Sequence, residues 1–403
     1  MSRKLTVLSA LLFLFGIAPA LALAATSPAS TPAASSAKLQ YGGWLPFWQA
    51  QAGEQDVALH LASLNEVSLF SYEISNNGAL IDSLNIGGGG WTDWLSAVKD
   101  MGVKVIPTIA WFDPDGIEKL LSNTKTRQAE EASIAQLVTS NQFDGIDIDF
   151  EGMYPATRPY YSLFIEGLAM RLHPLGKKLT CTVVPRAPLA SLYAVVPTST
   201  IVYPENYTVL NQYCDEVRLM AYDQETTDIQ LNVSKGGSGT LYAPVADPDW
   251  VKKIIQVALQ SISPKKIMLG VPTYGYEYEV SWANGQTTYQ RVRAFDFFTA
   301  MDRANSLGIT PVRDNAGELS FTYSSTTYIP EPPILTSEIS STEPAVLMNT
   351  NPNATTTFFV SFPDAQSEAD KIALAKQYGL RGVMFFKVDG DIDPEIWNII
   401  TPN

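Results

Sequence analysis

Eight short apolar runs separated by helical patterns constrain the fold of this chain more than any other feature. Amphipathic segments, such as residues 91–102, 157–176, 248–262 and 367–379, fall between the runs. Strands that alternate with helices indicate βαβ units and a parallel sheet. Eight such units favour a closed (β/α)8 TIM barrel over an open sheet. The predicted strands are YGGWLPFW at 41–48 and residues 66–74, 103–111, 143–150, 179–185, 216–223, 266–275 and 382–388.

One interval breaks this rhythm, between the seventh and eighth predicted strands. It contains a helical pattern at residues 295–308, strand-like runs at 319–328 and 355–362, and a Pro/Ser/Thr-rich stretch at 331–357. We therefore predict an α/β barrel over residues 39–403 that carries a small α+β insertion at about residues 276–362.

The first residues are typical of a secretory signal peptide, which we predict over residues 1–24. Arg3 and Lys4 precede an apolar run at 5–17, and the Ala22-Leu23-Ala24 triplet is an A-x-A-type cleavage site. An uncleaved membrane anchor is the alternative, because the run approaches the ~20 residues that span a bilayer. We predict cleavage, with no stable membrane span afterwards, and a secreted, extracellular or periplasmic (cell-envelope) protein. Residues 25–38, rich in Ala, Ser, Thr and Pro, are predicted to be a linker.

The charge balance restricts the partners. The chain has 41 acidic and 27 basic residues and a formal net charge of −14. An acidic surface repels polyphosphates, so we expect no nucleic acid as a partner, whereas a neutral sugar polymer is compatible. We expect a monomer.

The cysteines and histidines indicate no metal centre. Cys181 and Cys214 fit a disulfide of an exported protein and two small core residues equally well. The only histidines, His60 and His173, are distant from each other, and together with the two cysteines they supply no zinc-binding spacing. We expect no metal and no cofactor.

The segment FDGIDIDFEG at 143–152 places four acids within eight positions. Because strand side chains alternate between faces, Asp147, Asp149 and Glu151 share one face and Asp144 lies on the other. In a barrel the three-acid face points into the lumen, and Glu151 lies at the C-terminal end, where barrel active sites open. Crowded carboxyls cannot all ionise easily, so at least one is predicted to be protonated near neutral pH and suited to general acid catalysis.

Three other interpretations of this segment compete with a strand that carries catalytic acids. An EF-hand loop that begins at Asp147 would need Glu at its twelfth position, where Arg158 stands. A solvated acidic turn would expose Ile146 and Ile148. Magnesium held by the acids remains open as an alternative.

The segment also resembles the D-G-x-D-x-D-x-E signature of glycoside hydrolase family 18, the chitinase-like barrels. All five defined positions match over residues 144–151. MAYD at 220–223 is similar to the M-x-Y-D motif on the family's sixth strand, and GVPTYGY at 270–276 to its seventh strand. YGGWLPFW and residues 379–397 resemble the first and last strands of exported bacterial members. The resemblance covers about residues 40–400.

The resemblance implies a substrate-assisted mechanism. Glu151 would protonate the leaving oxygen, and the substrate's own 2-acetamido oxygen would attack the anomeric carbon. Asp149 would orient the acetamido N–H and share a proton with Asp147, while Tyr222 would bond the acetamido group. Such chemistry retains configuration and requires an N-acetyl group.

Two departures from the family pattern concern substrate choice. The third strand usually carries S-x-G-G, but here Thr108 keeps only the hydroxyl and Trp111 replaces a glycine, where we expect it to reshape the cleft. Phe386 stands where the family usually has Trp beneath the reacting sugar. The predicted catalytic residues are Glu151, Asp149, Asp147 and Tyr222; the predicted substrate-binding residues are Met220, Asp223, Phe386, Trp111, Trp44 and Tyr274; the predicted supporting residues are Asp144 and Thr108.

The sequence thus predicts an exported retaining glycosidase that hydrolyses β-1,4-linked N-acetylglucosamine polymers, either chitin-like or peptidoglycan. A chitinase-like lectin that binds without cleaving is the main alternative, although such relatives commonly lose the acid that Glu151 supplies here. A metal-dependent barrel enzyme is a third possibility, and a chelator would distinguish it.

Overall fold

Eight parallel strands close into a barrel in the computed structural model, with neighbours in the order β1-β15-β9-β8-β7-β6-β5-β2 and β2 paired back to β1. The structure describes residues 38–75, 78–88, 90–237, 239–283, 286–324 and 355–400. All eight predicted strands are present; the third is divided into β4 and β5 at Pro107, which has no N–H to donate. The bounds are β1 Gln40–Pro46, β2 Glu66–Ile74, β3 Leu80–Asp82 (beside β2), β4 Lys104–Val105, β5 Thr108–Trp111, β6 Gly145–Phe150, β7 Lys178–Val183, β8 Glu216–Met220, β9 Ile267–Pro272 and β15 Gly382–Phe386.

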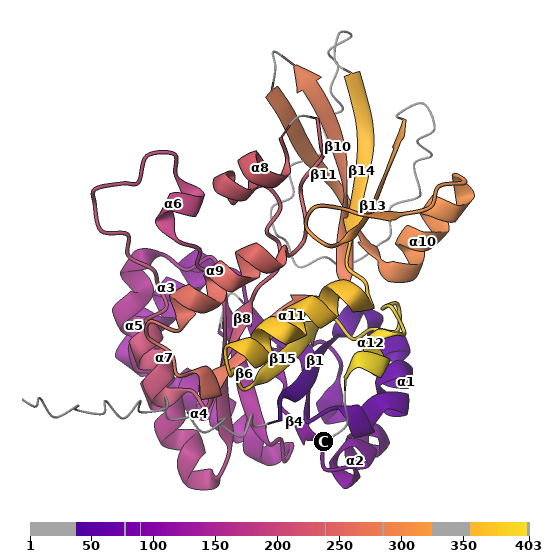
Figure 1. The fold of residues 1–403 in the computed structure, drawn as a ribbon. Helices are drawn as coiled ribbons and strands as arrows, with labels where there is room; N and C mark the ends of the chain where they lie inside the picture. Colours follow the sequence, from indigo (N-terminus) through magenta and orange to yellow (C-terminus); the bar gives the residue numbers. More distant parts are fainter. Residues whose placement is uncertain are drawn as a thin grey trace, which may run out of the picture. The chain divides into compact units, whose positions relative to one another are not determined.

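Helices follow the strands and surround the barrel, so the fold is the predicted (β/α)8 arrangement (Figure 1). Local signals explain several helix starts: Asp364 and Ser367 form a capping box at α11, and Pro248 occupies the first position of α9. The α-helices are α1 Ala50–His60, α2 Thr92–Asp100, α3 Pro114–Ser122, α4 Thr124–Ser140, α5 Arg158–Leu172, α6 Leu189–Leu192, α7 Tyr207–Tyr213, α8 Ile229–Lys235, α9 Pro248–Ala258, α11 Ala365–Gln377 and α12 Ile396–Ile399. The 3-10 helices are η1 Phe47–Gln49, η2 Leu61–Ser63, η3 Ile86–Gly88, η4 Pro155–Thr157, η5 His173–Leu175 and η6 Pro264–Lys266.

Two apolar layers hold the barrel together. The outer layer lies between strands and helices; in β6 it receives Ile146, Ile148 and Phe150, and the ring of Phe150 stacks on Phe164 of α5. The inner layer fills the lumen with a smaller cluster of buried side chains. That inner cluster comprises Trp44, Phe70, Ala110, Met268 and Met384.

The insertion after β9 forms, in its described residues, a five-stranded antiparallel sheet in the order β11-β10-β14-β13-β12, accompanied by the helix α10. Only Thr273 separates β9 from β10, so the first insertion strand continues directly from the barrel (Figure 1). Buried Glu318 joins the sheet to the barrel, because its carboxylate accepts the backbone N–H groups of Val245 and Ala246. The bounds are β10 Tyr274–Ala283, β11 Gln286–Asp296, α10 Phe297–Ser306, β12 Val312–Arg313, β13 Leu319–Ser324 and β14 Thr355–Phe362.

Cys181 of β7 and Cys214, just before β8, form a disulfide. Of the two possibilities that the sequence left open, the structure therefore has the cross-link. The predicted signal peptide lies outside the described residues, as does the predicted linker up to residue 37. Across the described ranges, no helix combines the length and apolar character needed to cross a bilayer.

Candidate active site

The acidic face of β6 points into the barrel, as the alternation of its side chains predicts. Asp147 and Asp149 are buried, and Glu151 follows the last residue of β6, partly exposed. The Glu151 N–H donates to the carbonyl of Trp111, which fixes the backbone at this end of the strand. The three carboxyls thus lie in a line from the barrel interior to the C-terminal ends of the strands.

Asp147 is surrounded by donors. The hydroxyl of Thr108 lies 2.9 Å from its Oδ2, which is the support we expected from that residue. Thr180 donates to Oδ1 at 2.8 Å, and Thr182 lies 3.0 and 2.9 Å from the two oxygens. Trp44 Nε1 approaches Oδ2 at 3.4 Å, so the predicted sugar platform is instead a buried side chain that bonds Asp147.

Asp149 has the opposite environment. Its Oδ1 is buried and has no hydrogen-bond partner among the described residues. Burial, together with the charges of Glu151 and Asp147, raises the pKa of Asp149 well above its ordinary value. The environment of Asp149 therefore favours the protonated form of its carboxyl.

The environment of Glu151 favours the protonated form of its carboxyl. Burial raises its pKa from 4.5 to about 7, and the charges of Asp223 and Glu205 contribute to the increase. An acid whose pKa lies near neutrality is populated in its protonated form and still releases the proton readily.

Asp223, three residues after the end of β8 at Met220, is held by the insertion. Its backbone is in the left-handed region, with φ of 59°. Tyr274 and Tyr276 of β10 both donate to its Oδ1, at 2.5 and 2.7 Å. Tyr274 is a predicted site residue, whereas Tyr276 was missed, although it lies on the same strand face two positions later.

Aromatic rings gather around Phe386 at the end of β15. Its ring stacks on Tyr222, with centroids 5.4 Å apart, and meets Trp44 and Tyr274 edge to face, each at 5.9 Å. Met220 and Tyr222 belong to one apolar cluster with Tyr274, and Phe386 packs against it. Tyr222, Met220, Phe386 and Tyr274 are thus brought together, as expected.

An ion pair that lies near the acids was not predicted from the sequence. Arg186, beyond β7, donates to the carboxylate of Glu205 at 2.7 Å, and its guanidinium lies over the rings of Tyr203 and Tyr207. Glu205 contributes to the raised pKa of both Asp149 and Glu151. It lies in an irregular loop, where no periodic pattern marks its direction.

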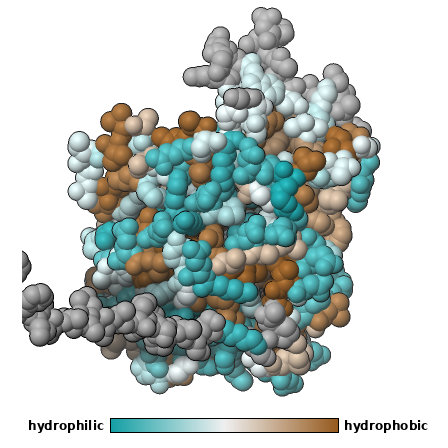
Figure 2. All heavy atoms as spheres, viewed as in Figure 1, coloured by the Kyte–Doolittle hydropathy of each residue, from teal (hydrophilic) through white to brown (hydrophobic). Residues whose placement is uncertain are grey.

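The same loop carries exposed apolar side chains. In Figure 2, hydrophobic residues gather at the upper left, over the segment that carries α6 in Figure 1. The exposed apolar residues of this segment are Tyr193, Val195, Val196 and Val202.

Trp111 does not lie where we expected it. The side chain is buried in the outer layer and packs edge to face on Phe150, with ring centroids 5.5 Å apart. Strand alternation explains the difference, because Ala110, not Trp111, belongs to the inner cluster. The replaced glycine of the family pattern therefore alters helix packing rather than the site.

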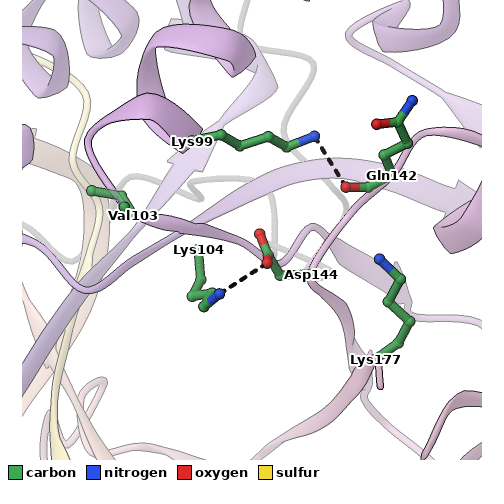
Figure 3. A pocket seen from close by; sticks show the side chains of 7 residues that line it. Lys99, Val103, Lys104, Gln142, Asp144 and Lys177 are labelled. Atoms are coloured by element: carbon green, nitrogen blue, oxygen red, sulfur yellow. Dashed lines mark hydrogen bonds and ion pairs between the residues drawn. The ribbon is translucent and has the colours of Figure 1, made fainter. Parts of the chain in front are cut away.

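Asp144 also lies apart from the other acids, at the N-terminal end of β6. It accepts the backbone N–H of Val105 at 2.9 Å and pairs with Lys104 at 3.2 Å. Asp144 and Lys104 line a hollow of about 390 Å³ together with Lys99 and Lys177 (Figure 3). Asp144 therefore supports the strand ends and not the candidate site.

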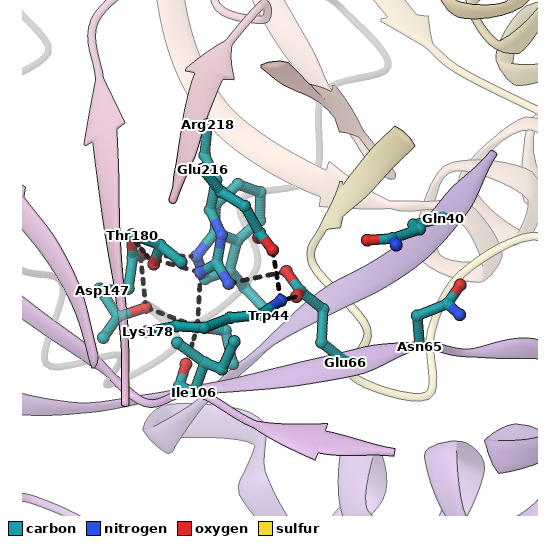
Figure 4. A network of polar contacts seen from close by, with 12 residues as sticks. Gln40, Trp44, Asn65, Glu66, Ile106, Asp147, Lys178, Thr180, Glu216 and Arg218 are labelled. Atoms are coloured by element: carbon teal, nitrogen blue, oxygen red, sulfur yellow. Dashed lines mark hydrogen bonds and ion pairs between the residues drawn. The ribbon is translucent and has the colours of Figure 1, made fainter. Parts of the chain in front are cut away.

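A buried arginine lies beneath the acids. Arg218 of β8 is fully buried and extends between Asp147 and Glu66, at 3.1 and 2.8 Å (Figure 4). Burial and the charge of Glu216 raise the pKa of Glu66 to about 7. Glu216 in turn pairs with Lys178 and with a second arginine, Arg381.

The described ranges contain no group of three or more His, Cys, Asp or Glu side chains arranged to hold a metal ion. In particular, the donors around Asp147 are hydroxyl, indole and guanidinium groups, which occupy the positions that a cation would need.

Comparisons with known proteins agree with this geometry. The chain is 26% identical to an uncharacterized glycosylase, YvbX of Bacillus subtilis, over 54% of its own length and 58% of that protein. The chain thus spans somewhat more than half of this curated relative. Among solved structures, the Bacillus cereus spore cortex-lytic enzyme SleL is similar with a TM-score of 0.66 at 19% identity, covering 91% of this chain and 76% of that one. A chitinase of Chromobacterium violaceum has a TM-score of 0.64 at 20% identity, with 90% and 98% covered.

The family assignment follows from a match over most of the chain. The model of glycosyl hydrolases family 18 matches residues 55–391, which include β6, the MAYD segment and the insertion. A barrel with an acidic inner face on its fourth strand and a glutamate of raised pKa at the strand end agrees with that match. The chain belongs to glycosyl hydrolases family 18.

Proposed function

We propose that the protein is an exported retaining glycosidase that hydrolyses β-1,4-linked N-acetylglucosamine polymers, with the acetamido group of the substrate as nucleophile. The observation that supports this most directly is the line of Asp147, Asp149 and Glu151, in which the outermost carboxyl has a pKa of about 7. A single proton donor at the strand end, with Tyr222 and Phe386 beside it, suits a mechanism in which the substrate supplies the second catalytic group.

In the proposed reaction, Glu151 gives its proton to the glycosidic oxygen while the acetamido oxygen attacks the anomeric carbon. The leaving sugar departs, and a cyclic oxazolinium intermediate remains. Asp149 orients the acetamido N–H and Tyr222 bonds the acetamido oxygen. Water then opens the ring, and Glu151 accepts its proton, so that the configuration at the anomeric carbon is retained.

The first experiment compares the parent with Glu151→Gln on N-acetylglucosamine oligomers. We expect a loss of about 10²- to 10⁴-fold in kcat, because general acid catalysis contributes on that scale. Asp144→Asn is the matched control, since that acid lies at the other end of β6 and is expected to leave kcat unchanged. Equal hydrolysis by Glu151→Gln and the parent would refute the assignment.

A second experiment addresses the nucleophile and the polymer. Oligomers without the 2-acetamido group are expected to remain uncleaved, and their hydrolysis would indicate a mechanism with two carboxylates. Product analysis on chitin oligomers and on purified peptidoglycan separates the two polymers. Tight binding of oligomers without products would instead favour a lectin.

A further inference from the structure

We propose that Arg218 keeps Asp147 in its anionic form, so that Asp149 alone carries the proton of this carboxyl pair at neutral pH. Arg218 is thus a positioning residue for Asp147, Asp149 and Glu151, and the inference rests on the proposed function of these three acids. It differs from the family expectation that the two aspartates share a proton.

The hydrogen bonds of Asp147 carry the inference. A carboxylate only accepts hydrogen bonds, whereas its protonated form needs an acceptor for its own O–H. Oδ2 faces Arg218 at 3.1 Å and the indole N–H of Trp44 at 3.4 Å, and neither group can accept. The hydroxyls of Thr108, Thr180 and Thr182 also contact the carboxyl, but a hydroxyl can either donate or accept. Arg218 is therefore the contact that favours the carboxylate most, because a proton on Asp147 would remove the anion that pairs with it.

Arg218 is held too firmly to move away from Asp147. It is fully buried, its second nitrogen bonds Glu66 at 2.8 Å, and it also donates to Ser68 at 2.9 Å (Figure 4). A buried guanidinium stays charged and requires a paired anion nearby. Asp147 and Glu66 are the carboxyls that it contacts.

Asp149, two residues after Asp147 on β6, forms no comparable ion pair among the described residues. Its Oδ1 is buried and has no hydrogen-bond partner among the described residues, whereas Asp147 is already paired with Arg218. The raised pKa of Asp149 agrees with this assignment.

The charged and titratable groups around the pair come from several elements. The groups that face Asp149 are Glu151 and Asp147 of β6, Arg218 of β8, Glu205 of the loop before α7, Tyr222 after β8 and Tyr161 of α5. The groups that surround Arg218 are Asp147, Glu66 of β2 and Glu216 of β8, with Lys178 and Arg381 paired to Glu216.

Infrared spectroscopy of protein labelled with ¹³C-aspartate tests the assignment at pH 7, because the label separates protonated aspartic acids from protonated glutamic acids. We expect the parent to show a labelled carboxylic-acid band of which one residue's share is missing in Asp149→Asn. If Asp149→Asn keeps the full band, the proton resides on Asp147 and the proposal is wrong.

The role of Arg218 is tested in the Asp149→Asn background. Adding Arg218→Met is expected to restore the missing share, because Asp147 then takes up the proton, whereas adding Arg218→Lys is expected not to. A band that stays absent with methionine would show that the threonines suffice without Arg218. Should the methionine variant fail to fold, Thr182→Val in the same background, which removes a donor to both oxygens, gives a partial restoration.

This measurement needs no substrate and is therefore independent of the proposed function. Loss of the band in Asp149→Asn supports the protonation assignment even in a protein that cleaves no N-acetylglucosamine polymer. Conversely, active hydrolysis with an unchanged band supports the function and rejects the role of Arg218.

Discussion

The pKa of Glu151 depends on the charge of Asp223, and the substitution Asp223→Asn tests this dependence. Burial is the largest cause of the increase in the pKa of Glu151 from 4.5 to about 7, Asp223 is the next and Glu205 follows. The pKa of Glu151 is raised by about 2.5 in total, and burial contributes more to this increase than the charge of Asp223 does. Removing the Asp223 charge is therefore expected to lower the pKa by less than half of the increase, or at most about one pH unit. Water around the exposed side chain of Asp223 screens the charge and reduces the effect below that bound.

The assay is kcat/KM on a chromogenic N-acetylglucosamine oligomer as a function of pH, which reports groups of the free enzyme. Glu151 acts in its protonated form, so activity falls as the pH rises through its pKa. We expect Asp223→Asn to move this alkaline limb to lower pH by about 0.5 to 1 unit, and Glu205→Gln to move it less. An unchanged limb, a shift to higher pH, or a larger shift for Glu205→Gln would refute the reasoning. Thermal unfolding of each variant checks that the fold is intact.

Three further predictions concern the frame of the site. Replacing both Cys181 and Cys214 with Ser opens a loop of 33 residues and is expected to lower the free energy of unfolding by about 3–4 kcal/mol relative to the oxidised parent, measured by denaturant titration with the reduced parent as a control. Equal stability of the variant and the oxidised parent would contradict this. Glu318→Gln loses one acceptor for the buried amides of Val245 and Ala246 and is expected to cost about 2 kcal/mol of stability; a smaller loss than that of a half-buried control, Glu279→Gln, would count against it. Phe386→Leu removes the ring that stacks on the site and is expected to raise KM about two- to tenfold with kcat nearly unchanged; a loss confined to kcat would show that the ring acts in the transition state.

The periodicity of single strands predicted much of this structure. The alternation in β6 correctly assigned Asp147 and Asp149 to the lumen and Ile148 to the outer layer. The same rule, extended to β7 and β8, would have indicated Thr182 and Arg218 as lumen residues, because they alternate with apolar neighbours. These residues were missed only because the motifs drew attention to the strand ends.

Other features had no local signal. Glu205 reaches the acids from an irregular loop, and its position depends on the packing of Arg186 between two tyrosines. Trp111 aligns with a family glycine that lines the site, but its position on the strand turns its side chain to the outer layer, so the prediction for this residue was wrong. The disulfide was undecidable because Cys181 and Cys214 suit a core as well as a bridge, and only the three-dimensional distance between them decides.

The direct continuation of β9 into β10 sets the boundary for any exchange of the insertion with a relative. The hydroxyls of Tyr274 and Tyr276 donate to Asp223, and we call this pair of hydrogen bonds the clamp. Just beyond it, the register of β10 against β11 shifts between Glu277 and Tyr278. A chimaera joined before Tyr274 would import a foreign clamp together with the foreign sheet. A junction placed at the register shift would leave the clamp with its own barrel, so that the outer sheet can be recombined as a specificity module while the acid–base apparatus stays native.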